Sequence, residues 1–359
     1  MKILVIALSG IGDALMFTPS LEKLKEKFPS SQIDALVMFK GVQDIFSRLP
    51  EISTVHYWDF LYQNKFASLK FVLTLRKKYD CTINVYPANR KEYNLISFLI
   101  GAHKKAAVKY LRMDLANFGW LNNLRVTEDD SLHNIEENIK LTELITGEKY
   151  NSIAPMKIVL DEKETRFTEE FLRSQNITND DLVVGFHPGC AVLKNHDKRR
   201  WETEKFSALA QKLISEKNAK ILLFGGPEEK HLRSEIINKT NSDFCIEVKT
   251  ESFLQTAAVM KRCNLFVTND SALMHTAAAL KLKIAAIIGP TNTNYIYPWQ
   301  TEYRIASLNL ECSPCFYYSP KPLTCTRTDL KFKCIKELEV DLVYTKVLEL
   351  LGGSISISK

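Results

Sequence analysis

The sequence predicts an α/β protein built from two doubly wound parallel sheets, and three observations lead to this fold class. The chain has 359 residues, which corresponds to roughly two domains at about 150 residues each. Apolar residues make up 45% and charged residues 25%, which excludes a disordered tail, a collagen-like repeat and a coiled-coil rod. Short apolar runs alternate with helix-like segments in both halves, and this β-α-β order implies parallel sheets.

The first half begins with a continuous apolar run, Ile3 to Leu8, which is typical of a strand covered on both faces. A glycine turn follows, and apolar residues then recur at helical spacing until Pro29 ends the helix. The further elements expected in this half are a strand at 33–38, a helix at 65–78, a strand at 81–86 and a helix at 133–146.

Residues 151–181 are polar and less regular, so they separate the two halves. The alternation restarts with a strand at 182–186. The elements expected after it are a helix at 202–216, strands at 221–224 and 245–248, a helix at 252–261, a strand at 265–267, a helix at 271–280, a strand at 284–288 and a last helix at 336–351.

The charge balance and the apolar segments limit the class of protein. A net charge of +6 suits an anionic substrate or an acidic membrane surface, but it falls short of the basic stripe typical of nucleic-acid binding. No apolar run reaches the roughly 18 residues that a membrane span needs. The apolar start is too short for a signal peptide and leads directly into a glycine turn. We therefore expect a cytoplasmic protein that binds no nucleic acid.

Ligands of doubly wound sheets bind beyond the carboxyl ends of the strands, so the residues after each strand are the candidate site. The first turn contains Gly10, Gly12 and Asp13 and lacks the third glycine of the dinucleotide fingerprint, which disfavours NAD. Asp13 has two interpretations. It is either a helix cap beside glycines or a general base, because the glycines leave room for a substrate.

The turns after the next two strands carry charge. Gly189 precedes the basic run Lys198-Arg199-Arg200, whose cations suit a phosphate or diphosphate; a solvated charge run is the alternative. Glu229 follows the tight turn Gly225-Gly226-Pro227 and can accept both hydroxyls of a ribose. Its alternative role is that of an acidic residue matching a helix dipole.

The strand at 265–267 leads into Asp270 and Ser271, which are good helix-start residues. The free amides of that first turn form a site for a diphosphate. His275 lies one turn further on the same face, with a purely structural histidine as the alternative. The chain contains no Asp-x-Asp triplet, the carboxylate pair with which glycosyltransferases that bind a nucleotide sugar through Mg²⁺ commonly hold the metal. Its absence points to neutralisation of a diphosphate by amides and cations instead.

Four of the eight cysteines cluster towards the C-terminus, namely Cys312, Cys315, Cys325 and Cys334. A C-x2-C pair followed by two more cysteines is compatible with a tetrahedral zinc or iron thiolate site. Disulfides or reduced thiols are the alternatives. We expect a structural role for any metal there, because four thiolates leave no open coordination position.

Four motifs in fixed order carry a family resemblance. They are SGIGD at 9–13, HPG at 187–189 with the basic segment before Trp201, GGPEE at 225–229 and NDSALMH at 269–275. This order resembles glycosyltransferase family 9, the heptosyltransferase family of lipopolysaccharide core synthesis, over nearly the whole chain. The resemblance implies a GT-B fold, with two Rossmann-like domains facing across a cleft.

The domains implied are an acceptor-binding domain at 1–175, a nucleotide-sugar-binding domain at 176–335 that includes the four-cysteine segment 312–334, and a helix and tail at 336–359. The resemblance also implies an inverting, metal-independent transfer that needs no catalytic cofactor. Asp13 matches the catalytic base, and Gly10 and Gly12 lie on the acceptor side. The residues that match the donor site are Gly189, Lys198, Arg199, Glu229, Asp270, Ser271, Ala272 and His275.

Two positions depart from the family pattern. Ala272 stands where the family usually has glycine, and Arg199 stands where it has lysine, two residues before the tryptophan. A bulkier residue at position 272 keeps the backbone further from a ligand than glycine would.

The expected reaction moves a heptose from ADP-heptose to a lipopolysaccharide core or related saccharide. The expected acceptor is an anionic or lipid-linked saccharide, and surface cations hold the enzyme peripherally at the inner membrane, namely Lys104, Lys105, Lys109 and Arg112. Three alternatives remain: a nucleotide-sugar epimerase on the same fold, a family member with another donor such as a UDP-N-acetylhexosamine, and a non-catalytic module whose basic loop binds a polyanion.

Overall fold

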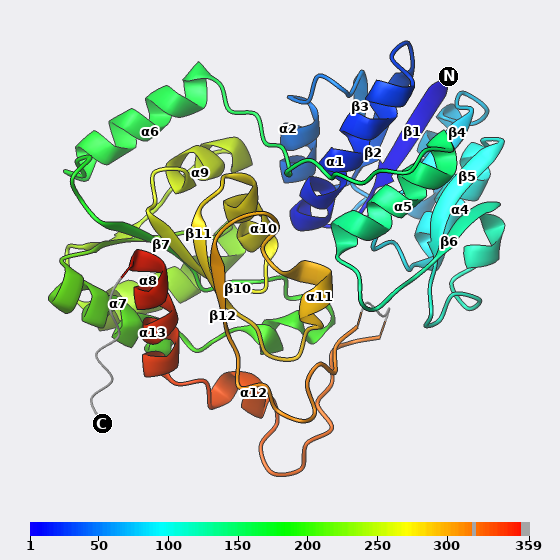
Figure 1. Cartoon of the computed structure of the whole chain (residues 1–359). Coiled ribbons are helices and arrows are strands. Elements are labelled where there is room, and N and C mark those ends of the chain that lie inside the picture. The colour runs from blue at the N-terminus through cyan, green and yellow to red at the C-terminus, as the bar shows by residue number, and fades with distance from the viewer. Residues whose placement is uncertain (318–320, 353–359) are drawn as a thin grey trace. The chain divides into compact units, whose positions relative to one another are not determined.

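The computed structural model describes residues 1–317 and 321–352 and contains two α/β units (Figure 1). Unit 1 comprises Met1–Val159 together with Asn294–Tyr297. Unit 2 comprises Leu160–Thr293, Pro298–Tyr317 and the described chain from Lys321 onward. Each unit contains one six-stranded sheet in which all pairings of the described strands are parallel. The predicted fold class is therefore confirmed, while the predicted tail at 353–359 lies outside the described residues.

The sheet of unit 1 has the strand order β3-β2-β1-β4-β5-β6. Its strands are β1 (Lys2–Ala7), β2 (Gln32–Val37), β3 (Thr54–Tyr57), β4 (Cys81–Asn84), β5 (Lys104–Lys109) and β6 (Leu124–Thr127). Its helices are α1 (Ile11–Lys27), α2 (Lys40–Phe46), α3 (Lys65–Thr74), α4 (Lys91–Ile100), the short 3-10 helix η1 (Gly119–Leu121) and α5 (Asn134–Thr146). Helix α1 packs against α2 and α5, and α3 packs against α4.

The sheet of unit 2 has the strand order β12-β11-β10-β7-β8-β9. Its strands are β7 (Val183–His187), β8 (Lys220–Leu223), β9 (Cys245–Glu247), β10 (Leu265–Asn269), β11 (Lys283–Ile287) and β12 (Tyr303–Ala306). Its helices are α6 (Glu162–Ser174), η2 (Leu193–Arg199), α7 (Thr203–Lys217), η3 (Pro227–Glu229), α8 (Lys230–Thr240), α9 (Phe253–Met260), α10 (Ala272–Ala279), α12 (Lys333–Lys336) and α13 (Val340–Leu351). The short helix α11 (Thr293–Ile296) lies where the chain passes between the units.

Central strands form where the sequence has unbroken apolar runs. In β1 every residue after Lys2 is buried, and all five residues of β7 and of β10 are buried. A strand covered by helices on both faces has no solvent side, so it needs no polar alternation. These buried strands hold the turns that follow them, which is where the polar residues of the candidate site lie.

The segment 151–181 is more regular than the sequence pattern indicates, because it contains α6. Asp161 caps this helix by accepting a hydrogen bond from the amide of Lys163 at 3.0 Å, and Glu164 completes the capping box. Glu164 is the buried residue of the helix, and only three of its thirteen residues are apolar, so the segment looks polar in the sequence although those three lie on one side of the helix. The Asp-x-x-Glu signature was the available signal.

Among residues 1–317 and 321–352, no helix is both long enough and apolar enough to cross a bilayer.

Candidate active site

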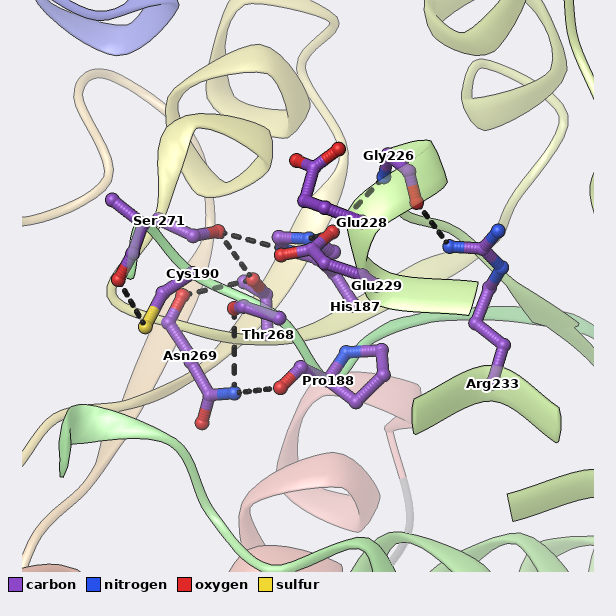
Figure 2. A network of polar contacts seen from close by, with 12 residues as sticks. His187, Pro188, Cys190, Gly226, Glu228, Glu229, Arg233, Thr268, Asn269 and Ser271 are labelled. Atoms are coloured by element: carbon purple, nitrogen blue, oxygen red, sulfur yellow. Dashed lines mark hydrogen bonds and ion pairs between the residues drawn. The ribbon is translucent and has the colours of Figure 1, made fainter. Parts of the chain in front are cut away.

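Three adjacent strand ends in unit 2 bring polar side chains together (Figure 2). His187 is the last residue of β7, Glu229 ends the 3-10 turn after β8, and Ser271 precedes α10 after β10. Strand β7 lies between β8 and β10 in the sheet, so the three turns share one edge. All three side chains are buried although each is polar, so each needs hydrogen-bond partners.

His187 links the other two side chains. Its Nδ1 lies 2.8 Å from Ser271 Oγ, and its Nε2 lies 3.1 Å from Glu229 Oε2. The amide of Gly226 also donates to Glu229 Oε2, at 3.0 Å. Burial alone would raise the pKa of Glu229, but His187, the Gly226 amide and Arg200 together hold that pKa below its usual value. Glu229 is therefore an ionised acceptor held in one orientation.

The basic run after Gly189 divides into a buried part and an exposed part. The Arg199 guanidinium forms a buried ion pair with Asp270, which also accepts a hydrogen bond from Thr291 Oγ1 at 2.7 Å. Arg200 Nη2 donates to the carbonyl of Cys190 at 2.6 Å and lies 3.8 Å from Glu229 Oε1. Lys198 is exposed and pairs with Asp197 at 3.2 Å. The structure thus brings Arg199 and Arg200, rather than Lys198, to the buried cluster.

Asn269 connects the loops that form this cluster. Its Nδ2 donates to the carbonyl of Pro188 at 2.8 Å, and its Oδ1 accepts a hydrogen bond from the amide of Trp201 at 3.0 Å. A side chain on Gly189 would collide with the cluster, because a Cβ there would lie 1.8 Å from Glu229 Oε1. Glycine at this position is therefore required by close approach of the loop to Glu229.

The N-terminus of α10 lies beside this cluster, because Ser271 precedes the helix directly. Ser271 adopts an extended conformation at the cap position, but its hydroxyl bonds to His187 and does not cap the helix. The first-turn amides are consequently oriented for an anion, as expected of a helix start. Burial lowers the pKa of His275 to about 4, so its imidazole is neutral at physiological pH, and no side chain of the described structure contacts its Nδ1 by a hydrogen bond.

Asp13 belongs to unit 1, where it is the third residue of α1. It is half-buried, and its Oδ2 accepts a hydrogen bond from the amide of Gly10 at 3.1 Å. Gly10 precedes the helix and Gly12 is buried within its first turn. The capping interpretation therefore describes one thing that Asp13 does, and its role as a base stays a prediction.

Comparison with known proteins identifies the family. Residues 68–323, well over half of the chain, match the model of glycosyltransferase family 9 (heptosyltransferase). The chain belongs to glycosyltransferase family 9. It is accordingly a glycosyltransferase, and the predicted family is confirmed.

Similar proteins agree with this family in sequence and in fold. The chain is 27% identical to a lipooligosaccharide heptosyltransferase 2 of Campylobacter jejuni, over 99% of both chains. Its structure is similar to that of E. coli ADP-heptose lipopolysaccharide heptosyltransferase II, with a TM-score of 0.73 and 21% identity over 98% of both chains. It is also similar to E. coli heptosyltransferase WaaC solved with ADP, with a TM-score of 0.65 and 19% identity over 98% of this chain and 100% of that one. These similarities confirm the GT-B fold.

The four cysteines of this family 9 enzyme do not form a recognisable metal centre. In the described parts of the chain, no group of three or more His, Cys, Asp or Glu side chains is arranged to hold a metal ion. Cys312, Cys315, Cys325 and Cys334 are free thiols, and burial together with the neighbouring thiols raises the pKa of Cys334 to about 11. The expectation of a structural zinc or iron site there gains no support from the structure.

Sequence reasoning did not assign a role to His187, Asn269 or Thr291. Each connects site residues that are far apart in the chain, so their roles depend on which strands become neighbours. A signal for His187 was present, because a polar residue at the end of an apolar strand faces the ligand edge of such a sheet. Ala272 is the first residue of α10 in this glycosyltransferase, and its contact with a donor stays a prediction.

Proposed function

We propose that this glycosyltransferase transfers a heptose from ADP-heptose to a lipopolysaccharide core saccharide, with inversion and without a metal ion. The observation that carries the proposal is the buried cluster at the ends of β7, β8 and β10. It combines an oriented carboxylate, two arginines and a helix N-terminus within one sheet edge. This combination matches the hydroxyls and the diphosphate of a nucleoside diphosphate.

The donor binds with its ribose hydroxyls on Glu229, whose ionised carboxylate His187 holds in place. The diphosphate lies against the first-turn amides of α10, with Arg199 and Arg200 as the nearby cations. These groups neutralise the charge that develops as the diphosphate leaves, which is the role a metal plays in other enzymes. The similarity to a heptosyltransferase solved with ADP supports ADP as the leaving nucleotide.

The acceptor hydroxyl is activated by Asp13. The carboxylate takes the proton while the acceptor oxygen attacks the anomeric carbon, the bond from that carbon to the diphosphate oxygen breaks, and ADP leaves with the bonding electron pair. A single displacement of this kind inverts the anomeric configuration. The proposal requires Asp13 of unit 1 to meet the donor bound by unit 2 during the reaction.

The acceptor is an anionic, lipid-linked saccharide on the cytoplasmic side of the inner membrane. The exposed Lys104 and Lys109 are available to its phosphates. Lys105 donates to the carbonyl of Ala102, and Arg112 binds Asp130 with a hydrogen bond of 2.9 Å, so these two are already engaged.

Replacing Asp13→Asn tests the proposal. The amide keeps the acceptor oxygen that caps α1, so the fold and ADP binding should be unchanged, whereas transfer should fall about 10²–10⁴-fold because no base remains. Transfer is measured as ADP release from ADP-heptose with and without a heptose-deficient core saccharide, and Glu22→Gln on the same helix is the control. Wild-type turnover in Asp13→Asn removes Asp13 from the mechanism. Donor consumption that does not need the acceptor contradicts glycosyl transfer.

A further inference from the structure

The positive charge of the chain is concentrated in one segment of unit 1. Residues 61–120 contain eleven Lys and Arg but only three Asp and Glu, a surplus of eight positive charges. The whole chain has a net charge of +6, so the rest of the protein is slightly acidic. The donor site lies in unit 2 and Asp13 in the first turn of α1, so neither belongs to this segment, and of its cations only Lys104 and Lys109 were assigned above to the acceptor.

The same segment contains most of the large apolar side chains that are exposed to solvent. Of fifteen such exposed side chains in the described chain, eleven lie between residues 61 and 120. Tyr62 and Phe66 are 88% and 87% exposed, and Leu115 is 77% exposed. Single exposed apolar residues are ordinary, but a cluster of this kind marks a surface that binds something.

These side chains lie on neighbouring elements. Helix α3 exposes Phe66, Leu69 and Leu73, whose spacing of three and four residues places them on one face of the helix. Helix α4, which packs against α3, exposes Leu95 and Phe98.

Helix α4 also packs against η1, where Trp120 is exposed. Exposed lysines accompany the apolar residues, among them Lys70 on α3 and Lys91 on α4. We call this surface, formed by the exposed residues of α3, α4 and η1, the α3–α4 face.

We propose that the α3–α4 face docks on an anionic lipid bilayer, with its apolar side chains entering the headgroup region and its lysines binding lipid phosphates. This inference deepens the proposed function by naming the surface that would bring the enzyme to a lipid-linked acceptor. Apolar insertion together with electrostatic attraction is the usual basis of peripheral membrane binding. A second copy of this chain would bind the α3–α4 face poorly, because two such cationic faces repel each other.

Nucleic acid would pair with the lysines of this face, but it would leave the exposed leucines without an apolar partner.

Vesicle binding of the full-length protein tests the inference. Vesicles of phosphatidylcholine alone are compared with vesicles that also contain phosphatidylglycerol, at low and high salt. The wild-type protein should sediment with the anionic vesicles, less so at high salt.

The apolar double variant Phe66→Ser/Phe98→Ser and the charge double variant Lys70→Glu/Lys91→Glu should each weaken binding on the order of tenfold or more. Matched controls are Leu144→Ser and Lys163→Glu/Lys217→Glu, which change exposed residues elsewhere.

The outcomes separate docking from catalysis. Transfer to a soluble, delipidated saccharide should be the same in all these variants and in the wild type. If wild-type protein ignores anionic vesicles, or if both face variants bind them like the wild type, the docking inference is overturned even when transfer is intact. If transfer fails in the wild type but vesicle binding depends on the face, the proposed function is wrong and the docking surface stands. A face variant that changes only the oligomeric state in light scattering identifies a self-interface and overturns the inference.

Discussion

His187 shows how a single residue organises the candidate donor site. Its two ring nitrogens reach side chains that come 42 and 84 residues later in the chain. Glu229 and Ser271 would otherwise be buried polar groups with fewer partners, which is costly in an apolar setting. His187 therefore acts as a positioning residue for the carboxylate that we propose binds the ribose.

The glycine next to this network allows a sharp test. Gly189→Ala places a methyl group where Glu229 Oε1 now lies, so the carboxylate must move. We expect the affinity for ADP to fall on the order of tenfold or more, with a loss of about 1–3 kcal/mol in the free energy of unfolding. Isothermal titration calorimetry measures the first effect and urea unfolding the second.

Gly10→Ala is the matched control, because a Cβ there meets its nearest atom, Asp13 Oδ2, only at 3.8 Å. That substitution should leave ADP binding unchanged. Equal ADP affinity of Gly189→Ala and the wild type would show that Glu229 does not bind the nucleotide.

At the scale of the element, α5 carries a buried acid that ought to make stability depend on pH. Glu137 is fully buried, and its Oε1 accepts a hydrogen bond from the amide of Asp129 at 2.6 Å. Burial raises the pKa of Glu137 to about 7, although this amide and Lys140 oppose the shift. The carboxyl is therefore protonated in the folded protein over a pH range in which the unfolded chain is already ionised.

The sign of the effect follows from this difference. Between about pH 4.5 and pH 7 the folded state binds more protons than the unfolded state, so stability falls as the pH rises. Glu137→Gln removes this contribution, and the variant should gain on the order of 2 kcal/mol relative to the wild type between pH 5 and pH 8. Urea unfolding at a series of pH values measures it, with Glu169→Gln on the exposed side of α6 as the control. Parallel curves for Glu137→Gln and the wild type would contradict the assignment.

At the scale of the whole molecule, the two units divide the proposed work. Unit 2 contains the complete buried network of the donor site, whereas unit 1 contains Asp13 and the α3–α4 face. When ADP binds in the absence of an acceptor, it should therefore stabilise unit 2 and leave unit 1 largely unchanged. Because a ligand stabilises the state that binds it, ADP at 100 times its dissociation constant should add about 2.7 kcal/mol of stability.

Hydrogen exchange locates this stabilisation. We expect ADP to slow exchange of backbone amides in three segments of unit 2, at 187–190, 225–229 and 269–275. Exchange in the segment 61–120 of unit 1 should remain as in the free protein. Protection confined to unit 1 would contradict the placement of the nucleotide.

Local sequence patterns were sufficient for the class of fold, because short apolar runs such as 3–8 and 183–186 alternate with helical segments, as is typical of strands covered on both faces. It also located the turns that carry Asp13, Glu229 and Asp270, because glycine and helix-start residues mark strand ends locally. The helix at 162–174 was not predicted, because only three of its thirteen residues are apolar.

Which of these residues come into contact depends on how the strands are arranged in the folded sheet. The ion pair of Arg199 with Asp270 and the bridge of His187 between Glu229 and Ser271 join segments separated by tens of residues. Such pairs depend on the order of strands in the sheet, and strand order arises from packing of the whole unit rather than from any local run of sequence. The exposure of Phe66 and Leu115 also depends on the packing of the whole unit, because an apolar side chain stays exposed only where no other part of the chain covers it.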